Sequence, residues 1–254
     1  MPSRLFTRLI ALCTLIVMAP VAQAAPPVAP AAIAAALADP ARSTDNRALD
    51  AGRQPAAMLA FSQLRRGDVV ADWGAGGGYY SELLARAVGP RGLVYGIGID
   101  AGYKPQVWQP LLDRHDNLRA MFVPAASQVF GANSLDVIFS HLEYHDLYWS
   151  SEKYHYPVRD VDAVLRNWFA ALRPGGRVIV IDHAASGGDP RETADKYHRI
   201  DPARVRADFA KAGFVLAAES TLLQNKDDPH TVGVFDPAVR GHTDRFAMRF
   251  VKPR

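Results

Sequence analysis

The stretch DVVADWGAGGGYYSELLARAV, residues 68–88, places a glycine-rich turn between an apolar run and an amphipathic one. The run 68–73 predicts a short buried strand, and the apolar spacing over 79–88 predicts a helix that ends at Gly89-Pro90. A glycine loop between a strand and a helix is the context in which backbone groups hold a nucleotide-like cofactor. The first hypothesis is therefore that this loop binds such a ligand.

The loop fits the pattern D-x-G-x-G-x-G from Asp72 to Gly78. Gly74 permits a tight turn after the strand, Gly76 lets a ligand lie against bare backbone, and Gly78 lets the helix pack close to the strand. The carboxylate of Asp72 can accept hydrogen bonds from loop amides or from a ligand ammonium group. The expected cofactor-binding residues are Asp72, Gly74, Ala75, Gly76, Gly78 and, further along, Asp100.

The spacing excludes two common kinds of glycine-rich site. Tyr79 stands where the dinucleotide fingerprint G-x-G-x-x-G needs its last glycine, which disfavours NAD and FAD. No lysine follows the glycines, as it would in a phosphate-binding P-loop. A turn that serves helix packing alone stays open as the alternative.

Outward from the loop, strand-like and helix-like segments alternate. Further strands are expected at 92–99, 118–124, 134–141, 177–183, 214–223 and 244–252. Further helices are expected at 106–116, 158–172, 202–213 and 46–64, and Pro55 should open the second half of the last of these. Such alternation predicts an α/β, Rossmann-like three-layer sandwich with a mostly parallel sheet. The last two strands have no helix between them, which predicts one antiparallel strand at that edge. Ligands of such sheets bind outside the carboxyl ends of the strands.

The amino-terminal segment has the composition of an export signal. Residues 1–24 combine two arginines, an apolar run too short to span a bilayer comfortably, and the cleavage site Ala22-Gln23-Ala24. An uncleaved anchor is the alternative. We expect a periplasmic or secreted protein with no stable membrane insertion after cleavage. Residues 25–41 are rich in alanine and proline and predict a tether or loosely packed lead-in, and 42–254 form the folded domain.

Cleavage changes the charge and the cysteine content. The remaining 230 residues hold 27 basic and 26 acidic side chains, a net charge of +1, which gives no indication of nucleic-acid binding. The only cysteine, Cys13, is removed with the signal, which excludes disulfides, thiolate metal sites and cysteine nucleophiles. The sequence does not indicate an oligomeric state.

Several segments together resemble a class I S-adenosylmethionine-dependent methyltransferase, within a group of exported bacterial predicted methyltransferases. The resemblance is carried by the segments 42–61, 69–97, 133–149, 172–183, 196–216 and 240–253. It implies a seven-stranded sheet whose last strand is antiparallel. It also implies that S-adenosylmethionine lies over the first two strands and that a small molecule accepts the methyl group.

The sequence departs from that family at two acidic positions. The second strand usually ends in an acid that holds the ribose hydroxyls, but Gly98 stands there and Asp100 follows two residues later. Asp100 shares the face of Gly98 on an extended chain, displaced by about 7 Å. It either reaches the ligand or merely starts the next loop. Pro124 replaces the acid that usually follows the third strand, where Ser127 or a backbone amide could substitute.

Candidate catalytic groups follow the strand at 134–141. A general base for methyl transfer to an oxygen or nitrogen acceptor could come from His141, Glu143, His145 or Asp146, and His183 after the next strand is a further candidate. On an extended segment the first three would share a face and could bind a metal, which gives a metal-assisted hydrolase as a further interpretation. No other ligand spacing reinforces it, and the leading interpretation needs no metal. These groups could also simply hydrogen-bond loops above the sheet.

Other clusters could shape the site. Five aromatic residues predict either an acceptor wall or a lid packed on the core: Tyr144, Tyr148, Trp149, Tyr154 and Tyr156. A surface or lid-side ion network is expected among Arg42, Asp45, Asp50 and Arg53. The group Arg199, His242 and Asp244 either orients the carboxyl-terminal segment or forms a capped turn.

The leading functional hypothesis is a methyltransferase that uses S-adenosylmethionine and a small-molecule acceptor. The alternative is a non-catalytic module on a methyltransferase-like fold that binds a ligand or a protein partner. Export favours this alternative, because S-adenosylmethionine is made in the cytoplasm and is charged.

Overall fold

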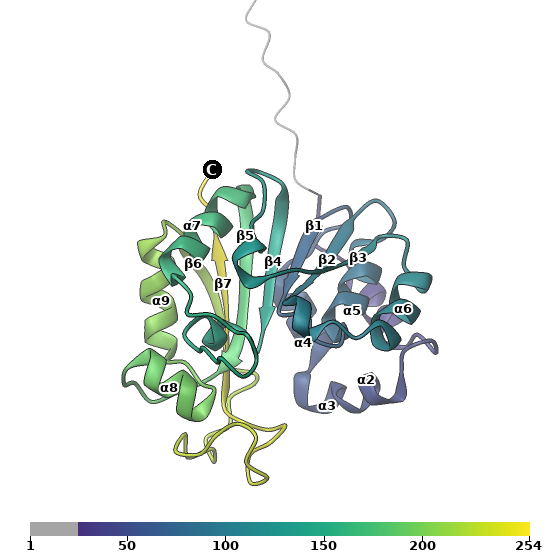
Figure 1. The fold of residues 1–254 in the computed structure, drawn as a ribbon. Coiled ribbons are helices and arrows are strands. Elements are labelled where there is room, and N and C mark those ends of the chain that lie inside the picture. Colours follow the sequence, from purple (N-terminus) through teal and green to yellow (C-terminus); the bar gives the residue numbers. More distant parts are fainter. Residues whose placement is uncertain (1–24) are drawn as a thin grey trace, which may run out of the picture.

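The computed structural model describes residues 25–254, shown as a ribbon in Figure 1. The expected signal segment and its cleavage site fall in residues 1–24, outside the described part of the chain. Within 25–254, no helix is both long and apolar enough to cross a bilayer.

A single seven-stranded sheet forms the centre, in the order β3-β2-β1-β4-β5-β7-β6. Its strands are β1 (Val69–Trp73), β2 (Leu93–Gly98), β3 (Leu118–Phe122), β4 (Leu135–His141), β5 (Leu172–His183), β6 (Val215–Ser220) and β7 (Arg245–Val251). β1 pairs in parallel with β2 and β4, whereas β7 runs antiparallel to both β5 and β6. The predicted fold class is confirmed, with the antiparallel strand one place in from the edge.

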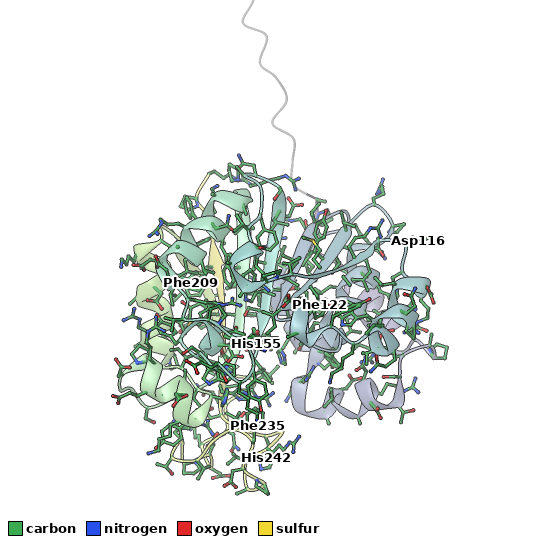
Figure 2. The ribbon with its side chains drawn as sticks, in the orientation of Figure 1. Asp116, Phe122, His155, Phe209, Phe235 and His242 are labelled. Atoms are coloured by element: carbon green, nitrogen blue, oxygen red, sulfur yellow. The ribbon has the colours of Figure 1, made fainter. Side chains whose placement is uncertain are left out.

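Helices cover both faces of this sheet and separate two apolar cores. One core packs under α1, α4, α5 and α6, and the other under α7 and α9. Phe122 and Phe209, labelled in Figure 2, belong to the first and second core respectively. The helices are α1 (Pro30–Leu37), α2 (Thr44–Ala48), α3 (Asp50–Arg53), α4 (Pro55–Ser62), α5 (Tyr79–Val88), α6 (Pro105–Arg114), α7 (Val161–Ala171), α8 (Pro190–Tyr197) and α9 (Pro202–Lys211).

The alanine- and proline-rich lead-in packs against the domain and is not a tether. Val28 donates its backbone N–H to the carbonyl of Leu64 at 2.6 Å, and α1 follows. Ile33 of α1 is buried in the first core. The expectation of a loose lead-in fails because a few apolar side chains among the alanines find a groove against α4 and α5.

The helical segment expected at 46–64 is broken into three: Pro55 predicts the break before α4, but the break between α2 and α3 at Leu49 was not expected. Gln54 has a positive φ of 45°, which ends α3, and Pro55 then opens α4 at the position where its missing N–H costs nothing. The break turns α3 across the carboxyl ends of the strands. It thereby brings Leu49 and Arg53 over the glycine loop.

Candidate cofactor and acceptor site

A cavity of about 240 Å³ lies at the carboxyl ends of β1 and β4. The glycine loop forms its floor, and α3 and the start of α5 form its sides. Glu143, two residues after the end of β4, forms part of the cavity wall. The lining residues are Asn46, Leu49, Arg53, Asp72, Gly74, Ala75, Gly76, Gly77, Tyr79, Tyr80, His141, Leu142 and Glu143.

Gly76 leaves free space where a ligand could rest on the backbone. Its φ is +50°, and a Cβ built on it would meet no atom within 4 Å. The loop conformation is fixed from below, because the indole Nε1 of the buried Trp108 donates to the carbonyl of Gly76 at 3.0 Å. A Cβ on Gly78 would instead collide with Leu111 of α6. Gly76 is therefore open, and a ligand on its backbone stays a prediction; Gly78 allows close packing against α6, whereas packing of α5 on the strand was expected.

Asp72 is a buried acid on the floor of this cavity. Ser81 donates its hydroxyl to the Asp72 carboxylate at 2.5 Å. Burial raises the pKa of Asp72 to about 7, although the bond from Ser81 and the charge of Arg53 act in the opposite direction. A ligand ammonium beside Asp72 would favour the charged carboxylate.

Arg53 supplies a cation that none of the described acids neutralises directly. Its guanidinium lies 4.3 Å from the centre of the Tyr79 ring, and none of the ion pairs within 25–254 includes it. Its neighbour Arg42 is fully buried and binds Asp50 with two hydrogen bonds of 2.7 and 2.8 Å. Asp50 also accepts a 2.7 Å bond from the Tyr79 hydroxyl. Of the expected ion network only the pair Arg42–Asp50 forms, and it holds the Tyr79 ring beside Arg53; neither Asp45 nor Arg53 has an ion-pair partner within 25–254.

The end of β2 carries aromatic packing in place of an acid. A Cβ on Gly98 would collide with the ring of Phe122, and Tyr103 and Trp108 pack on the same ring at 5.1 and 5.2 Å between centroids. Asp100 is exposed and outside the cavity lining, and its carboxylate caps the N–H of Ala101. A role for Asp100 in cofactor binding stays a prediction.

His141 and Glu143 face the cavity. Burial, followed by the charges of Arg53 and Arg245, lowers the pKa of His141 well below its usual value, and its buried Nε2 has no hydrogen-bond partner within the described chain. Glu143 covers Gly74 so closely that a Cβ there would collide with it. Burial and then the nearby Asp146 raise the pKa of Glu143 to about 8. Near neutral pH the cavity therefore holds a neutral imidazole and a largely protonated carboxyl group.

His145 turns away from the cavity. Leu142 adopts a positive φ of 58°, and the 3₁₀ helix η3 (Tyr144–Leu147) begins two residues later, so the alternation of faces ends with β4. His145 Nδ1 lies 2.8 Å from Asp182, which also accepts the His145 backbone N–H. Burial alone would lower the pKa of His145, but Asp182 and Asp146 raise it to about 9. His141 and Glu143 therefore face the cavity while His145 does not, and the described residues do not support the alternative of a metal held by all three.

A second cavity of about 330 Å³ adjoins the first across Leu49, Arg53 and Leu142. Arg245 contributes a buried guanidinium that donates to the Gly52 carbonyl at 2.7 Å and belongs to no ion pair within 25–254. His183 lies 2.6 Å from the Thr243 hydroxyl. Burial lowers the pKa of His183 well below its usual value and keeps it neutral.

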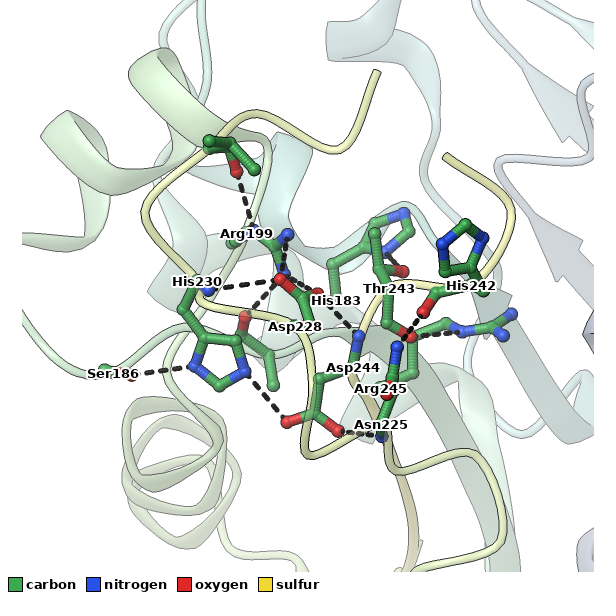
Figure 3. A network of polar contacts seen from close by, with 12 residues as sticks. His183, Ser186, Arg199, Asn225, Asp228, His230, His242, Thr243, Asp244 and Arg245 are labelled. Carbon is green, nitrogen blue, oxygen red and sulfur yellow. Dashed lines mark hydrogen bonds and ion pairs between the residues drawn. The ribbon is translucent and has the colours of Figure 1, made fainter. Parts of the chain in front are cut away.

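The carboxyl-terminal loop that walls the second cavity is held by a polar network (Figure 3). Arg199 is fully buried and binds Asp228 through two hydrogen bonds of 2.8 and 3.0 Å. Asp228 accepts the Asp244 N–H, and Asp244 binds His230 at 2.9 Å. The predicted orienting role fits Arg199 and Asp244. His242 is exposed and lies 3.0 Å from the Ala238 carbonyl instead.

The aromatic cluster lines neither cavity. The hydroxyls of Tyr144 and Tyr148 both donate to the buried Asp208, at 2.9 and 2.5 Å. Trp149 packs on Tyr156, with 5.1 Å between ring centroids. Packing on the core therefore fits Tyr144 and Tyr148, whereas Tyr154 is exposed, and an acceptor wall formed by this cluster stays a prediction.

Comparisons with known proteins bear on this arrangement. Residues 71–180 match the model of a family described as a methyltransferase domain. A S-adenosylmethionine-dependent methyltransferase from Aquifex aeolicus has a TM-score of 0.53 and 18% identity, covering 88% of this chain and 98% of its own. One from Mesorhizobium loti has a TM-score of 0.55 and 13% identity, covering 80% and 99%.

The chain has the class I methyltransferase fold. In this methyltransferase fold, the first cavity gathers most of the residues predicted from the glycine loop, together with His141 and Glu143. No sequence pattern predicted Tyr80 and Leu142 at the first cavity, or Thr243 and Arg245 at the second. The polar run RGHTDRF, residues 240–246, leads into the last strand and could have indicated Thr243 and Arg245.

Proposed function

We propose that this protein transfers the methyl group of S-adenosylmethionine to a small acceptor. The observation that carries the proposal is the open backbone at Gly76, in a cavity that is also lined by the buried acid Asp72 and by the guanidinium of Arg53, which has no ion-pair partner within 25–254. The methionyl end of S-adenosylmethionine has an ammonium and a carboxylate. Asp72 and Arg53 match these two charges in sign.

The first cavity is large enough to enclose only part of S-adenosylmethionine. Its volume of about 240 Å³ is below the range of roughly 300–1,000 Å³ that is usual for small-molecule pockets. The methionyl end fits within it. The adenosyl end would extend over the surface past Gly77, where a Cβ would meet only Val107 at 3.7 Å.

The second cavity is the proposed acceptor site. It touches the first at Arg53, so an acceptor there would lie beside the sulfonium that carries the methyl group. Attack by an acceptor oxygen or nitrogen breaks the bond between sulfur and the methyl carbon and releases S-adenosylhomocysteine. Neutral His183 takes the acceptor proton. Arg245 favours an acceptor that carries negative charge.

A non-catalytic ligand-binding module is the second candidate. The observation in its favour is the aromatic packing at Gly98, which leaves no acid at the end of β2 for ribose hydroxyls. We also propose export of the chain on the basis of residues 1–24. Cell fractionation and the amino-terminal sequence of the recovered protein test this, with Ala25 as the expected first residue.

Calorimetric titration with S-adenosylmethionine and S-adenosylhomocysteine tests the function. Gly76→Val fills the open backbone. Gly67→Val is the matched control, because Gly67 also has a positive φ and an empty surrounding, but lies outside both cavities. Micromolar binding that is lost only in Gly76→Val supports the proposal. Absence of binding to the wild type at millimolar ligand refutes it and leaves the binding module.

A further inference from the structure

We propose that His145, Asp146 and His198 bind a divalent transition-metal ion of the zinc type, next to the two cavities. His145 and Asp146 belong to η3, and His198 caps the carboxyl end of α8. One ligand atom from each of the three residues lies within 4.8 Å of the other two. None of these residues lines the cofactor or acceptor cavity, so the site is separate from the one proposed for methyl transfer.

The spacing of the ligand atoms suits direct coordination. His145 Nε2 lies 3.3 Å from Asp146 Oδ1, and His198 Nδ1 lies 3.6 Å from the same oxygen. Ligands about 2.0–2.1 Å from a tetrahedral zinc ion are roughly 3.3–3.4 Å apart. The two distances to Asp146 Oδ1 are therefore close to those of a tetrahedral site, and the two histidine nitrogens lie within 4.8 Å of each other.

Asp146 Oδ1 is a buried carboxylate oxygen without a hydrogen-bond partner among residues 25–254. Its contact with His145 therefore lacks hydrogen-bond geometry. Buried carboxylate oxygens are normally hydrogen-bonded or bound to a metal. An ion between the three groups would satisfy this oxygen directly.

Asp182 fixes the orientation of the His145 ring through a contact with its Nδ1. It lies 2.8 Å from His145 Nδ1, and its side chain is fully buried and also accepts the backbone N–H groups of His145 and His183. A proton held on Nδ1 by Asp182 leaves the lone pair of Nε2 free to point at Asp146. A carboxylate behind a histidine is the usual arrangement around metal ligands.

An aromatic shell surrounds the third ligand. The ring of His198 packs edge-on against His145 at 5.5 Å between centroids, and it contacts Trp149 at 5.4 Å and Phe235 at 5.1 Å. The side chains of Asp146 and His198 keep 18% and 22% of their surface exposed, which leaves an entry path. Apolar walls with one open side raise the strength of charged contacts inside.

The donor set indicates which ions fit. Two imidazole nitrogens and one carboxylate suit zinc, iron, nickel or copper, and not magnesium or calcium, which prefer oxygen ligands alone. Three protein ligands leave a coordination position for water or a substrate group, as in catalytic zinc sites. The competing explanation is a protonated His145 held between Asp182 and Asp146 without any metal.

Metal analysis of the mature chain separates the two explanations. The protein, free of any polyhistidine tag, is stripped with a chelator, dialysed against zinc or magnesium ions and assayed for bound metal. We expect about one zinc per chain and no retained magnesium. His198→Asn should lose the zinc, since asparagine tolerates the positive φ of 53° but is a poor zinc ligand. His242→Asn, at an exposed histidine outside the cluster, should keep it.

Two further measurements test the site without relying on the folding of His198→Asn. Asp182→Asn should weaken zinc affinity by about 10- to 100-fold. Cobalt bound to the wild type should give the intense visible absorption of a four-coordinate site, which needs no variant. The proposal is overturned if the wild type retains less than about a tenth of an equivalent of zinc, or if His198→Asn retains as much as the wild type. Neither result depends on binding of S-adenosylhomocysteine.

Discussion

Replacement of Asp72 by asparagine should stabilise the ligand-free protein at alkaline pH. Burial raises the pKa of Asp72 from 3.8 to about 7. Between these two pH values the folded state therefore keeps a proton that the unfolded state has already lost. The contribution of Asp72 to the free energy of unfolding is therefore largest below about pH 4, declines as pH rises toward 7, and is smallest above pH 7. A shift of about 3 units corresponds to roughly 4 kcal/mol at most, since each unit is worth about 1.4 kcal/mol.

Urea unfolding of residues 25–254 at pH 4, 6 and 8 measures this effect. The stability difference between Asp72→Asn and wild type should be smallest at pH 4 and should grow in favour of the variant up to pH 8. Asp227→Asn, at an exposed aspartate, is the control for loss of one negative charge. A difference that does not change with pH, or a variant less stable than wild type at pH 8, would refute the assignment of Asp72 as a buried acid.

The same substitution should weaken the ligand. A hydrogen bond to a charged group contributes about 1.5–3 kcal/mol, so Asp72→Asn should lower the affinity for S-adenosylhomocysteine by about 10- to 150-fold. Gain of stability together with loss of affinity is the signature of a residue kept for binding rather than for folding. A variant that binds as well as wild type would remove Asp72 from the proposed site.

Three further substitutions test other parts of the account. Arg53→Met should lower the affinity for S-adenosylhomocysteine by about tenfold or more with little loss of stability, and calorimetry that shows unchanged affinity would exclude Arg53 as the carboxylate partner. Gly78→Ala should lower the free energy of unfolding in urea by about 1–3 kcal/mol, because the new Cβ meets Leu111 and φ is +78°. An unchanged free energy of unfolding would contradict the described loop. Arg199→Met should cost about 3–5 kcal/mol, since it leaves the buried Asp228 without its cation, and a loss below about 1 kcal/mol would show that the network in Figure 3 adds little.

The local parts of the fold could be predicted from the sequence because they rest on short-range chemistry. The strand, the glycine turn and the helix that starts at Tyr79 all follow from residues adjacent in the chain. Pro55 likewise predicted the break before α4, because a proline is favoured at the first position of a helix. The lead-in was misjudged because its docking depends on a groove built by distant helices.

The site could be predicted only in part, because side-chain direction depends on turns that the sequence does not announce. His141 faces the cavity, yet the positive φ of Leu142 sends His145 toward Asp182. Arg53 reaches the glycine loop only through the fold of α3. The pairing of Asp146 with His198 joins segments about fifty residues apart, which no local spacing could indicate.

A crystal structure of residues 25–254 with bound S-adenosylhomocysteine would show whether the glycine loop holds the cofactor. We expect the ligand to lie on the backbone of Gly76, with its amino group at Asp72 and its carboxylate at Arg53. A ligand bound at another place, with Glu143 still closing the space over Gly74, would contradict it.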